Sequence, residues 1–440
     1  MLPRTQNRVI LDRMERFLYR LKQLIPKPVG DWLRPTYHFA LAFLGAVRYR
    51  FPSRDLTVIA VTGTKGKSTV VEIVAALLGG AGHSTASLST IQFKIGDQVR
   101  PNRYKMTTPG RFFVQRFLRE AVDTGCTYAV IELTSEGAKQ HRHRFIHLDA
   151  LIFTNLSPEH IESHGSFEKY KQAKLSIANQ LERSPKRPRT IVANVDNEHG
   201  ADFLRTPVEQ QLPYSLSDLK LHTLHKDGVS LVFDVGEEEI TIRVPLVGQF
   251  NVYNALAAIT LARQLGISWQ TIEKTLRHLP PVRGRVEQFA SPPGADKHIT
   301  AVVDYAHTPD SLEALYTAYK DVPKVCVLGN TGGGRDTWKR PEMAAIAEQY
   351  CQHIILTNED PYDEDPQRII DDMVSGIENK DKVTVIMDRR AAIKAALDQA
   401  TDGDYVLVSG KGTDPYIMGP ADSKEPWSDA AVVQELLEKP

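Results

Sequence analysis

The chain has 440 residues, of which 42% are hydrophobic and 25% charged, and its formal net charge at pH 7 is zero. That length is too great for one compact core, so two or three domains are expected. Zero net charge gives no global argument for nucleic-acid binding, and no run reaches the ~20 apolar residues that a membrane-spanning helix needs. We expect a cytoplasmic, monomeric protein that does not bind nucleic acid.

The three cysteines are Cys126, Cys326 and Cys351. They are far apart in the sequence and odd in number, so they are expected to form neither a disulfide framework nor a zinc site. Small buried side chains in a reducing compartment are the predicted state. The N-terminus alternates charged and apolar residues from Arg4 onward, which differs from the continuous apolar core of a signal peptide.

Residues 1–55 hold eleven Lys or Arg and four Asp or Glu, a local excess of seven positive charges. Apolar side chains at helical spacing in residues 7–25, with basic ones between them, predict an amphipathic helix. Pro26 and Pro28 are expected to end it, and residues 38–47 then form a short apolar helix. Two interpretations stay open: a docking arm that packs on the next domain, and a membrane-surface element suited to anionic lipid.

A glycine-rich segment follows the apolar run at residues 56–61, which predicts a buried strand leading into a helix. In such a loop, backbone N–H groups face an anion at the start of the helix. Lys67 would reach the terminal phosphates of a nucleotide, and Ser68 would offer its hydroxyl to Mg²⁺. The full P-loop pattern asks for glycine where the chain has Val61, so an ordinary glycine turn capped by Ser68 or Thr69 stays an alternative. The candidate nucleotide-binding residues are Gly63, Thr64, Lys65, Gly66, Lys67, Ser68 and Thr69.

Predicted strands alternate with predicted helices from residue 56 to about residue 283. Strands are expected at 57–61, 128–133, 150–154 and 190–194, and helices at 68–78, 111–123, 166–181, 252–265 and 269–279. This alternation predicts a parallel sheet with ligands at the carboxyl ends of its strands. Residues 217–245 differ, because three short strands separated by turns predict a small antiparallel insertion there.

Pro280 and Pro281, followed by Arg283, mark the predicted boundary of a second α/β domain. Its strands are expected at 300–304, 324–328, 353–357, 382–387 and 405–409. The predicted fold class is therefore α/β, with three parts. They are a short helical basic N-terminal arm at 1–55, a central P-loop parallel-sheet ATPase domain with a small β insertion at 56–284, and a Rossmann-like C-terminal domain at 285–440.

Glu132 ends an apolar strand, where a carboxylate beside a P-loop is well placed to bind Mg²⁺, an ion that prefers oxygen. A solvated charge at a strand end is the alternative. His160 follows the strand at 150–154, and Lys174 lies on the predicted helix at 166–181. Taken singly, a histidine after a strand is more often structural than a ligand, and a helical lysine is usually a solvated charge.

Taken together, these residues resemble the Mur ligase family, the ATP-dependent amide ligases that build the peptidoglycan stem peptide and include the folylpolyglutamate synthetases. The similar strings occur in family order from residue 62 to residue 412. Those at 304–310 and 333–340 are most similar to the members that add the third residue to UDP-MurNAc-L-Ala-D-Glu. The other strings are 62–69, 107–109, 132–137, 154–160 with Lys174, 194–196, 249–254, 284–287 and 410–412.

The resemblance implies a reaction and its cofactors, ATP and Mg²⁺. A substrate carboxylate would attack the γ-phosphate of ATP, and an incoming amine would then displace phosphate from the acyl phosphate to form an amide. Fixed cations would cancel the repulsion between the two anions: Lys67, one Mg²⁺ on Ser68 and Glu132, and a second on His160. The lysine that matches Lys174 is carbamylated in the family, which would give the second metal an oxygen ligand.

The resemblance also implies binding residues for the nucleotide, a nucleotide-sugar peptide or related carboxylate, and an amino acid. Asn251 and Asn254 match adenine contacts, and Arg285 and Asp304 match nucleotide contacts made when the C-terminal domain closes and excludes water. Arg142 is a physically sensible carboxylate clamp because it is planar and always charged, although a surface arginine is the alternative. The substrate residues so expected are Thr107, Thr108, Ser135, Gln140, Arg142, His307, Arg335, Asp360, Tyr362, Gly410 and Asp414.

Two departures from the family pattern leave the substrates open. Members that add the third residue have a separate N-terminal domain for the uridine nucleotide, whereas residues 1–55 predict basic helices. The donor could therefore be the usual nucleotide held differently, or a lipid-linked or otherwise altered carboxylate met at a membrane. Diaminopimelate-adding members carry Asp-Asn-Pro-Arg where this chain has Glu-Asp-Pro-Tyr at 359–362. That change disfavours diaminopimelate, and the acidic residues 363–365 would suit a basic acceptor such as lysine.

Two other functions remain as alternatives. A related amide ligase that adds glutamate to a folate-like or polymeric acceptor would share the ATP machinery and differ before residue 56 and around Tyr362. A non-ligating P-loop NTPase or kinase would need only the loop and the metal residues, and it leaves the string at 304–310 unexplained.

Overall fold

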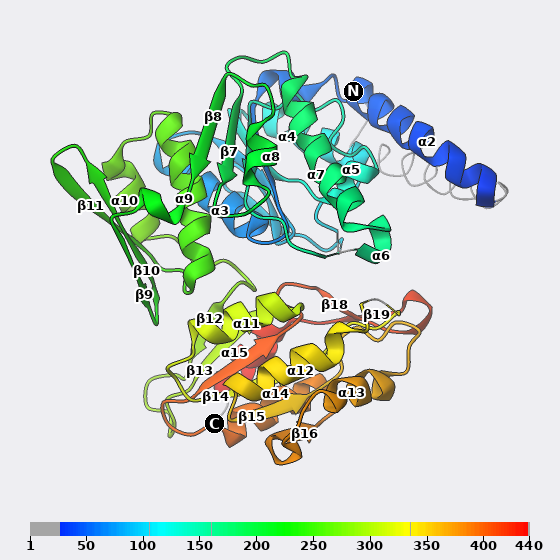
Figure 1. Ribbon diagram of the computed structural model, residues 1–440, viewed down its shortest axis with the longest axis vertical. Helices are drawn as coiled ribbons and strands as arrows, with labels where there is room; N and C mark the ends of the chain where they lie inside the picture. The colour runs from blue at the N-terminus through cyan, green and yellow to red at the C-terminus, as the bar shows by residue number, and fades with distance from the viewer. Residues whose placement is uncertain (1–26, 105, 160, 335, 439–440) are drawn as a thin grey trace.

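The computed structural model describes residues 27–104, 106–159, 161–334 and 336–438, and it contains two mainly parallel sheets covered by helices (Figure 1). The predicted α/β class is confirmed. The helix predicted at 7–25 and the candidate site residues His160 and Arg335 lie outside the described residues. None of the helices in the described ranges has the length and hydropathy that crossing a bilayer requires.

The first sheet has eight strands in the order β4-β3-β2-β5-β1-β6-β7-β8. Strand β1 pairs in parallel with β5 on one side and β6 on the other, so the ends of all three strands meet at one edge. The inner strands are buried along nearly their whole length, as expected for a sheet with helices on both faces. The strands are β1 (Thr57–Thr62), β2 (Thr85–Leu88), β3 (Gln92–Ile95), β4 (Gln98–Pro101), β5 (Tyr128–Glu132), β6 (Ala150–Phe153), β7 (Thr190–Asn194) and β8 (Gln210–Tyr214).

Helices cover both faces of this sheet. One apolar core joins it to α3, α9, α10 and a separate antiparallel sheet, which is the predicted insertion. The other core joins it to α4 and α7. The elements are η1 (Pro52–Asp55), α3 (Lys67–Gly80), α4 (Arg111–Asp123), α5 (Ser135–Lys139), α6 (Ile161–His164), α7 (Phe167–Glu182), α8 (Gly200–Leu204), η2 (Leu216–Asp218), β9 (Leu221–His225), β10 (Gly228–Val235), β11 (Glu238–Val244), α9 (Gln249–Gln264) and α10 (Trp269–Arg277).

The second sheet has six strands in the order β12-β13-β17-β14-β15-β16, all parallel except β12. Helices α11, α12 and α13 share a core with one face, and α14 and α15 with the other. The elements are β12 (Glu287–Ala290), β13 (Thr300–Asp304), α11 (Pro309–Ala318), β14 (Lys324–Leu328), α12 (Lys339–Tyr350), β15 (His353–Leu356), α13 (Pro366–Ser375), η3 (Lys380–Lys382), β16 (Val383–Val385), α14 (Arg389–Gln399), β17 (Tyr405–Ser409), β18 (Tyr416–Met418), η4 (Pro420–Asp422), β19 (Lys424–Pro426) and α15 (Asp429–Glu438).

Helix α2 spans Lys27–Arg48 and is much longer than the helix predicted at 38–47. Pro28 lies in its first turn, where a backbone N–H has no partner within the helix, so this proline does not prevent helix formation. The helix packs on α4 through Ala42, Gly45 and Ala46, which are all buried. The antiparallel strands β3, β4 and β12, at or near the sheet edges, were also not predicted.

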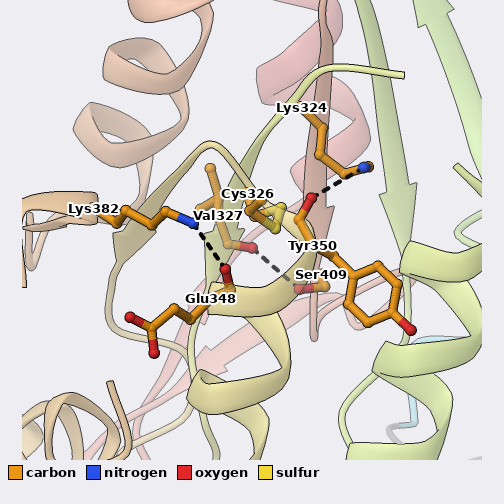
Figure 2. Close-up of a disulfide and its surroundings, with 8 residues drawn as sticks. Lys324, Cys326, Val327, Glu348, Tyr350, Lys382 and Ser409 are labelled. Atoms are coloured by element: carbon orange, nitrogen blue, oxygen red, sulfur yellow. Dashed lines mark hydrogen bonds between the residues drawn. A yellow bond between two sulfur atoms is a disulfide. The ribbon is translucent and has the colours of Figure 1, made fainter. Parts of the chain in front are cut away.

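Cys326 and Cys351 form a disulfide, so the prediction that the cysteines stay unpaired was wrong (Figure 2). Cys326 lies in β14, and helix α12 returns the chain to deliver Cys351 just before β15, the neighbour of β14. The Cα atoms are 6.1 Å apart although 25 residues separate them in sequence. Lys324 Nζ donates to the Tyr350 carbonyl at 3.1 Å beside it. Cys126 is buried and free.

A buried ion pair fastens α14 to α15, and breaking it is expected to lower the free energy of unfolding. Arg389 Nε and Nη2 donate to the two carboxylate oxygens of Asp429, each at 2.8 Å, and both side chains are almost fully buried. Asp429→Ala would leave a buried guanidinium without its anion, which costs about 3–5 kcal/mol. Chemical denaturation would measure this change.

The neighbouring pair on the same two helices is the matched control. Arg390 Nη2 and Glu435 Oε2 also lie 2.8 Å apart, but both side chains are exposed. Glu435→Ala is therefore expected to change the free energy of unfolding by about 1 kcal/mol or less. Equal effects of the two substitutions would contradict the assignment of Arg389–Asp429 as a structural anchor.

Candidate functional site

The glycine-rich loop between β1 and α3 has a backbone that requires glycine at two positions. Gly63 has a φ of 149° and Gly66 a φ of 81°. A Cβ atom at Gly63 would clash with Thr154 Oγ1, and one at Gly66 would clash with Asn254 Oδ1. The loop therefore lies closely between the segment after β6 and helix α9, and α3 begins at Lys67 immediately after it.

Gly66→Ala is expected to weaken ATP binding at least about tenfold, because the loop would have to move away from Asn254 and would lose a left-handed conformation that alanine rarely adopts. Equilibrium binding of a non-hydrolysable ATP analogue would measure the loss. Gly82→Ala is the control, since Gly82 also has a positive φ, of 87°, but its Cβ would meet nothing within 4 Å. Equal loss in both variants would mean that backbone strain alone explains the effect.

Hydrogen bonds from the segment after β6 hold the loop in place. The Lys65 amide donates to Asn155 Oδ1 at 2.9 Å, and Thr154 Oγ1 donates to the Lys65 carbonyl at 2.6 Å. Because β6 pairs with β1, both residues lie at the same edge of the sheet as the loop. Lys67 Nζ donates to the Thr64 carbonyl at 2.7 Å.

Glu132 lies beside the start of α3. Its carboxylate accepts a hydrogen bond from Ser68 Oγ at 2.8 Å, and Lys67 Nζ is 4.0 Å from its other oxygen. Pairing of Val61 with Glu132 in the β1–β5 ladder sets this position. Thr90 also donates to Glu132, from its amide at 2.9 Å, and its hydroxyl lies 2.7 Å from that of Thr107. Sequence reasoning missed Thr90, which follows β2, the strand next to β5.

Lys174 is buried in α7, directly behind the glycine-rich loop. Its Nζ donates to the Gly63 carbonyl at 2.5 Å and lies 4.9 Å from the centre of the Tyr170 ring. Burial, together with the nearby charge of Lys67, lowers the pKa of Lys174 well below its usual value. The protonated amine is therefore less favoured here than in a solvated lysine.

The expected donor-binding residues lie next to Glu132. Thr108 Oγ1 donates to the Glu132 carbonyl at 3.2 Å, and Arg142 donates to the Thr108 carbonyl and, at 2.7 Å, to Gln140 Oε1. Ser135 opens helix α5, three residues after Glu132. Burial lowers the pKa of Arg142. These contacts show that Arg142 is partly buried and hydrogen-bonded to its neighbours.

A cavity of about 550 Å³ lies between the two halves of the molecule and is lined from both. Lys65 forms an ion pair with Asp310 across it, and His307 Nε2 is 3.5 Å from Glu159 Oε1. Of the candidate residues, those that line the cavity are Thr64, Lys65, Gly66, Lys67, Ser68, Thr69, Thr107, Glu132, Asn254, Arg285, Asp304 and His307.

Asp304 and Arg285 form the C-terminal wall of this cavity. Asp304 Oδ2 accepts from the Val286 amide at 2.8 Å, and Oδ1 accepts from the Ala306 amide at 2.7 Å. Burial raises the pKa of Asp304. The Arg285 guanidinium lies 4.5 Å from the centre of the Tyr305 ring. On the opposite wall Asn254 lines the cavity, whereas Asn251 lies behind it and accepts from Asn254 Nδ2 at 2.9 Å.

Four other candidate residues belong to a second cluster in the C-terminal half and do not line the cavity: Asp360, Tyr362, Gly410 and Asp414. Its centre is the buried Lys411, whose Nζ lies 2.8 Å from Asp360 Oδ1 and 3.6 Å from Asp414 Oδ2. A Cβ atom at Gly410 would clash with Glu359. Lys411 and Glu359 were not predicted as site residues. Lys411 lies within the family-like string 410–412, and Glu359 is the first residue of the segment 359–362.

The acidic residues 363–365 have structural partners. Asp363 Oδ1 accepts from the Ala421 amide at 2.8 Å, and Asp365 Oδ1 caps α13 by accepting from the Gln367 amide at 3.0 Å. Glu364 accepts two hydrogen bonds from Arg340. These contacts weaken the hypothesis that the three carboxylates recognise a basic acceptor.

Comparisons with known protein families identify both halves of the chain. The family model described as "Mur ligase middle domain" matches residues 61–262, and "Mur ligase, glutamate ligase domain" matches residues 284–412. A UDP-N-acetylmuramoyl-L-alanyl-D-glutamate–2,6-diaminopimelate ligase from Aquifex aeolicus is 36% identical over 88% of this chain and 78% of its own length. A UDP-N-acetylmuramyl-tripeptide synthetase from Roseiflexus is 34% identical over 93% of this chain and 84% of its own length.

Solved structures of similar fold include a ligase of the same name as the Aquifex aeolicus relative. A UDP-N-acetylmuramoyl-L-alanyl-D-glutamate–2,6-diaminopimelate ligase has a TM-score of 0.61 and 29% identity, covering 89% of this chain and 81% of the other. Folylpolyglutamate synthase from Mycobacterium tuberculosis complexed with ADP has a TM-score of 0.65 and 17% identity, covering 85% and 92%. The second likeness concerns the fold alone.

Proposed function

Because this chain belongs to the Mur ligase family of ATP-dependent amide ligases, we propose that it adds the third amino acid to UDP-MurNAc-L-Ala-D-Glu in peptidoglycan synthesis. The observation that carries this proposal is the cavity lined by the glycine-rich loop, Glu132, Arg285 and Asp304. It lies beside Thr108, Gln140 and Arg142, and curated relatives that match most of the chain are named for this reaction.

The proposed reaction forms an acyl phosphate and then an amide. The donor carboxylate attacks the γ-phosphate of ATP, ADP leaves, and the acceptor amine displaces phosphate from the activated carbonyl. Lys67, at the start of α3, would hold the transferred phosphoryl group, and the helix N-terminus would face its charge. Arg142 would hold a donor carboxylate. The C-terminal wall around Arg285 would keep water from the acyl phosphate.

The residues beside Lys67 fit a magnesium ion. Ser68 Oγ and the Glu132 carboxylate, 2.8 Å apart, are hard oxygen donors of the kind that Mg²⁺ prefers. When bound, the ion would neutralise charge on the β- and γ-phosphates. Within the described ranges no three His, Cys, Asp or Glu side chains form a metal-binding group. We propose Ser68 and Glu132 as the magnesium ligands, with His160 and a carbamylated Lys174 completing a second site.

The lowered pKa of Lys174 suits this residue to carbamylation, because only an unprotonated amine attacks carbon dioxide. Its low pKa and its position behind the loop, within 2.5 Å of the Gly63 carbonyl, support this proposal. The carbamate would bring a negative charge next to Lys67. Mass spectrometry of the intact protein in bicarbonate under native conditions would detect the added group.

Position 362 bears on the identity of the acceptor amino acid. Tyr362 stands where diaminopimelate-adding members carry arginine, so the cation expected for a distal carboxylate is absent at this position. Diaminopimelate is therefore disfavoured, and we propose an amino acid without a distal carboxylate. Asp360, two residues before this position, forms a buried ion pair with Lys411.

The function is tested by phosphate release from ATP with UDP-MurNAc-L-Ala-D-Glu and a panel of amino acids, with mass spectrometry of the products. Formation of a tripeptide with one amino acid is the expected result. Turnover with a folate-like or polymeric carboxylate, and none with the UDP-linked dipeptide, would contradict the proposal. The protein would then be the related amide ligase that acts on such an acceptor. ATP hydrolysis without any amide product would mean that the protein is a non-ligating NTPase.

A further inference from the structure

Over residues 42–47, helix α2 presents its large apolar side chains outward and its small residues inward. Ala42, Gly45 and Ala46 are buried against α4, and a Cβ atom on Gly45 would lie only 3.6 Å from the Arg111 carbonyl oxygen. Leu44 is 53% exposed and Val47 47% exposed on the opposite side. This is the reverse of an ordinary surface helix, whose apolar stripe faces the core. Among the α2 side chains that the structure describes, which begin at residue 36, the other exposed large apolar ones are Tyr37, Phe39 and Phe43.

The outward surface of α2 lies at the margin of the molecule. Figure 1 shows α2, in blue, extending sideways from the N-terminal half at the margin of the molecule. Phe43 stacks edge-on against Phe51 and Phe145, so the base of the patch is fixed to the body. Contiguous exposed apolar side chains of this kind mark a surface that contacts a partner.

The charge around this patch favours an anionic partner. Residues 31–55 contain four arginines and two aspartates, Asp31 and Asp55, which is a local excess of two positive charges. Of these arginines, Arg48 and Arg50 are exposed at the C-terminal end of α2. A second copy of the chain would bring the same positive excess to the contact and be repelled. An apolar face bordered by arginines is instead complementary to the headgroups of anionic lipid.

We propose that the outward face of α2 docks this protein on the surface of an anionic lipid bilayer, with Leu44 and Val47 facing the acyl chains and Arg48 and Arg50 facing the headgroups. The helix would lie in the interface, since no helix in the described part of the chain can cross a membrane. This inference does not depend on the proposed reaction.

Docking through α2 would hold the donor site close to the bilayer. His38 of α2 contacts Arg111 at the start of α4, and Arg111 Nε donates to the Gln140 carbonyl at 3.0 Å. Gln140 in turn accepts from Arg142, the proposed donor clamp. The docking helix and the donor site are therefore joined by three consecutive contacts.

The test is flotation of the full-length protein with vesicles of phosphatidylcholine, alone or with about 30% phosphatidylglycerol, at low salt. Binding to the anionic vesicles is expected to exceed binding to neutral ones at least about fivefold, the effect of one basic residue near such a surface. Leu44→Glu/Val47→Glu is expected to lower anionic binding at least about tenfold. Arg48→Gln/Arg50→Gln should lower it about fivefold for each arginine.

The matched control is Leu221→Glu/Leu224→Glu, which changes two leucines of β9 with exposures of 58% and 47%. Figure 1 places β9 at the far side of the molecule from α2, so this variant should bind like the wild type. Unchanged ligase activity or circular dichroism would verify that each variant is folded.

Three results would overturn the proposal. The first is absence of binding to either vesicle, and the second is equal binding by the Leu44→Glu/Val47→Glu variant and the wild type. The third is a concentration-dependent dimer, seen by light scattering without vesicles and abolished by Leu44→Glu/Val47→Glu, which would assign the face to a second copy.

Discussion

Lys67→Met is expected to lower kcat about 10²- to 10³-fold, the usual cost of removing one preorganised charge that stabilises a transition state. Lys67 lies at the start of α3, with its Nζ 2.7 Å from the Thr64 carbonyl and 4.0 Å from Glu132 Oε1. Methionine keeps the length of the side chain and removes the charge that opposes repulsion between carboxylate and triphosphate. Single-turnover formation of ADP measures the step directly.

The control for Lys67→Met is Lys320→Met, which removes an exposed lysine that lies after α11 and outside the cavity. It should leave kcat unchanged. A Lys67→Met variant with an unchanged kcat and a raised KM for ATP would mean that Lys67 binds substrate and transition state equally. The proposed role in phosphoryl transfer would then be wrong.

Lys174→Ala is expected to reduce turnover about 10- to 100-fold, the usual effect of losing a group that supports a metal site. Activity should return partly with added acetate or bicarbonate, which can place an oxygen anion in the space left by the side chain. Lys171→Ala is the matched control, since Lys171 lies on the same helix and forms an ion pair with Asp202 at 2.5 Å. Full activity of Lys174→Ala without any additive would contradict the carbamate proposal.

The same residue should make stability depend on pH. The folded state lowers the pKa of Lys174, whereas the unfolded chain keeps a lysine pKa of about 10.4. Between the two values the unfolded state binds the extra proton, so the free energy of unfolding rises with pH up to about 10.4. Lys174→Met should lack this slope and be more stable than the wild type at pH 7 in buffer free of carbon dioxide. Denaturation midpoints across this pH range would reveal it.

The glycine-rich loop and Glu132 could be predicted because their signals are local. A β-branched run followed by Gly63, Gly66 and Lys67 specifies a strand, a turn and a helix start within fifteen residues. Parallel pairing of β1 with β5 is then enough to bring the end of β5, and with it Glu132, beside that loop. The expected strands β1, β5, β6 and β7 are all present, with at most one residue of difference at their ends.

The residues that sequence reasoning missed depend on which elements become neighbours. Thr90 reaches Glu132 only because β2 lies next to β5, and Lys411 pairs with Asp360 across 51 positions of sequence. The cysteine prediction failed for the same reason, since α12 brings Cys351 back to Cys326. The number of residues between two positions does not tell which helices and strands become neighbours in the folded protein.

The sequence by itself determined the α/β class, the nucleotide loop and the order of the ligase motifs, because backbone preference and hydrophobic period act over a few residues. Only the tertiary structure decided that Lys174 is buried behind Gly63, that Asn251 supports Asn254 rather than lining the cavity, and that α2 turns its leucine and valine outward. Each of these features depends on packing between segments that are distant in sequence. That packing determines which side chains are buried and which are exposed, and burial in turn shifts the charge state of an ionisable group such as Lys174.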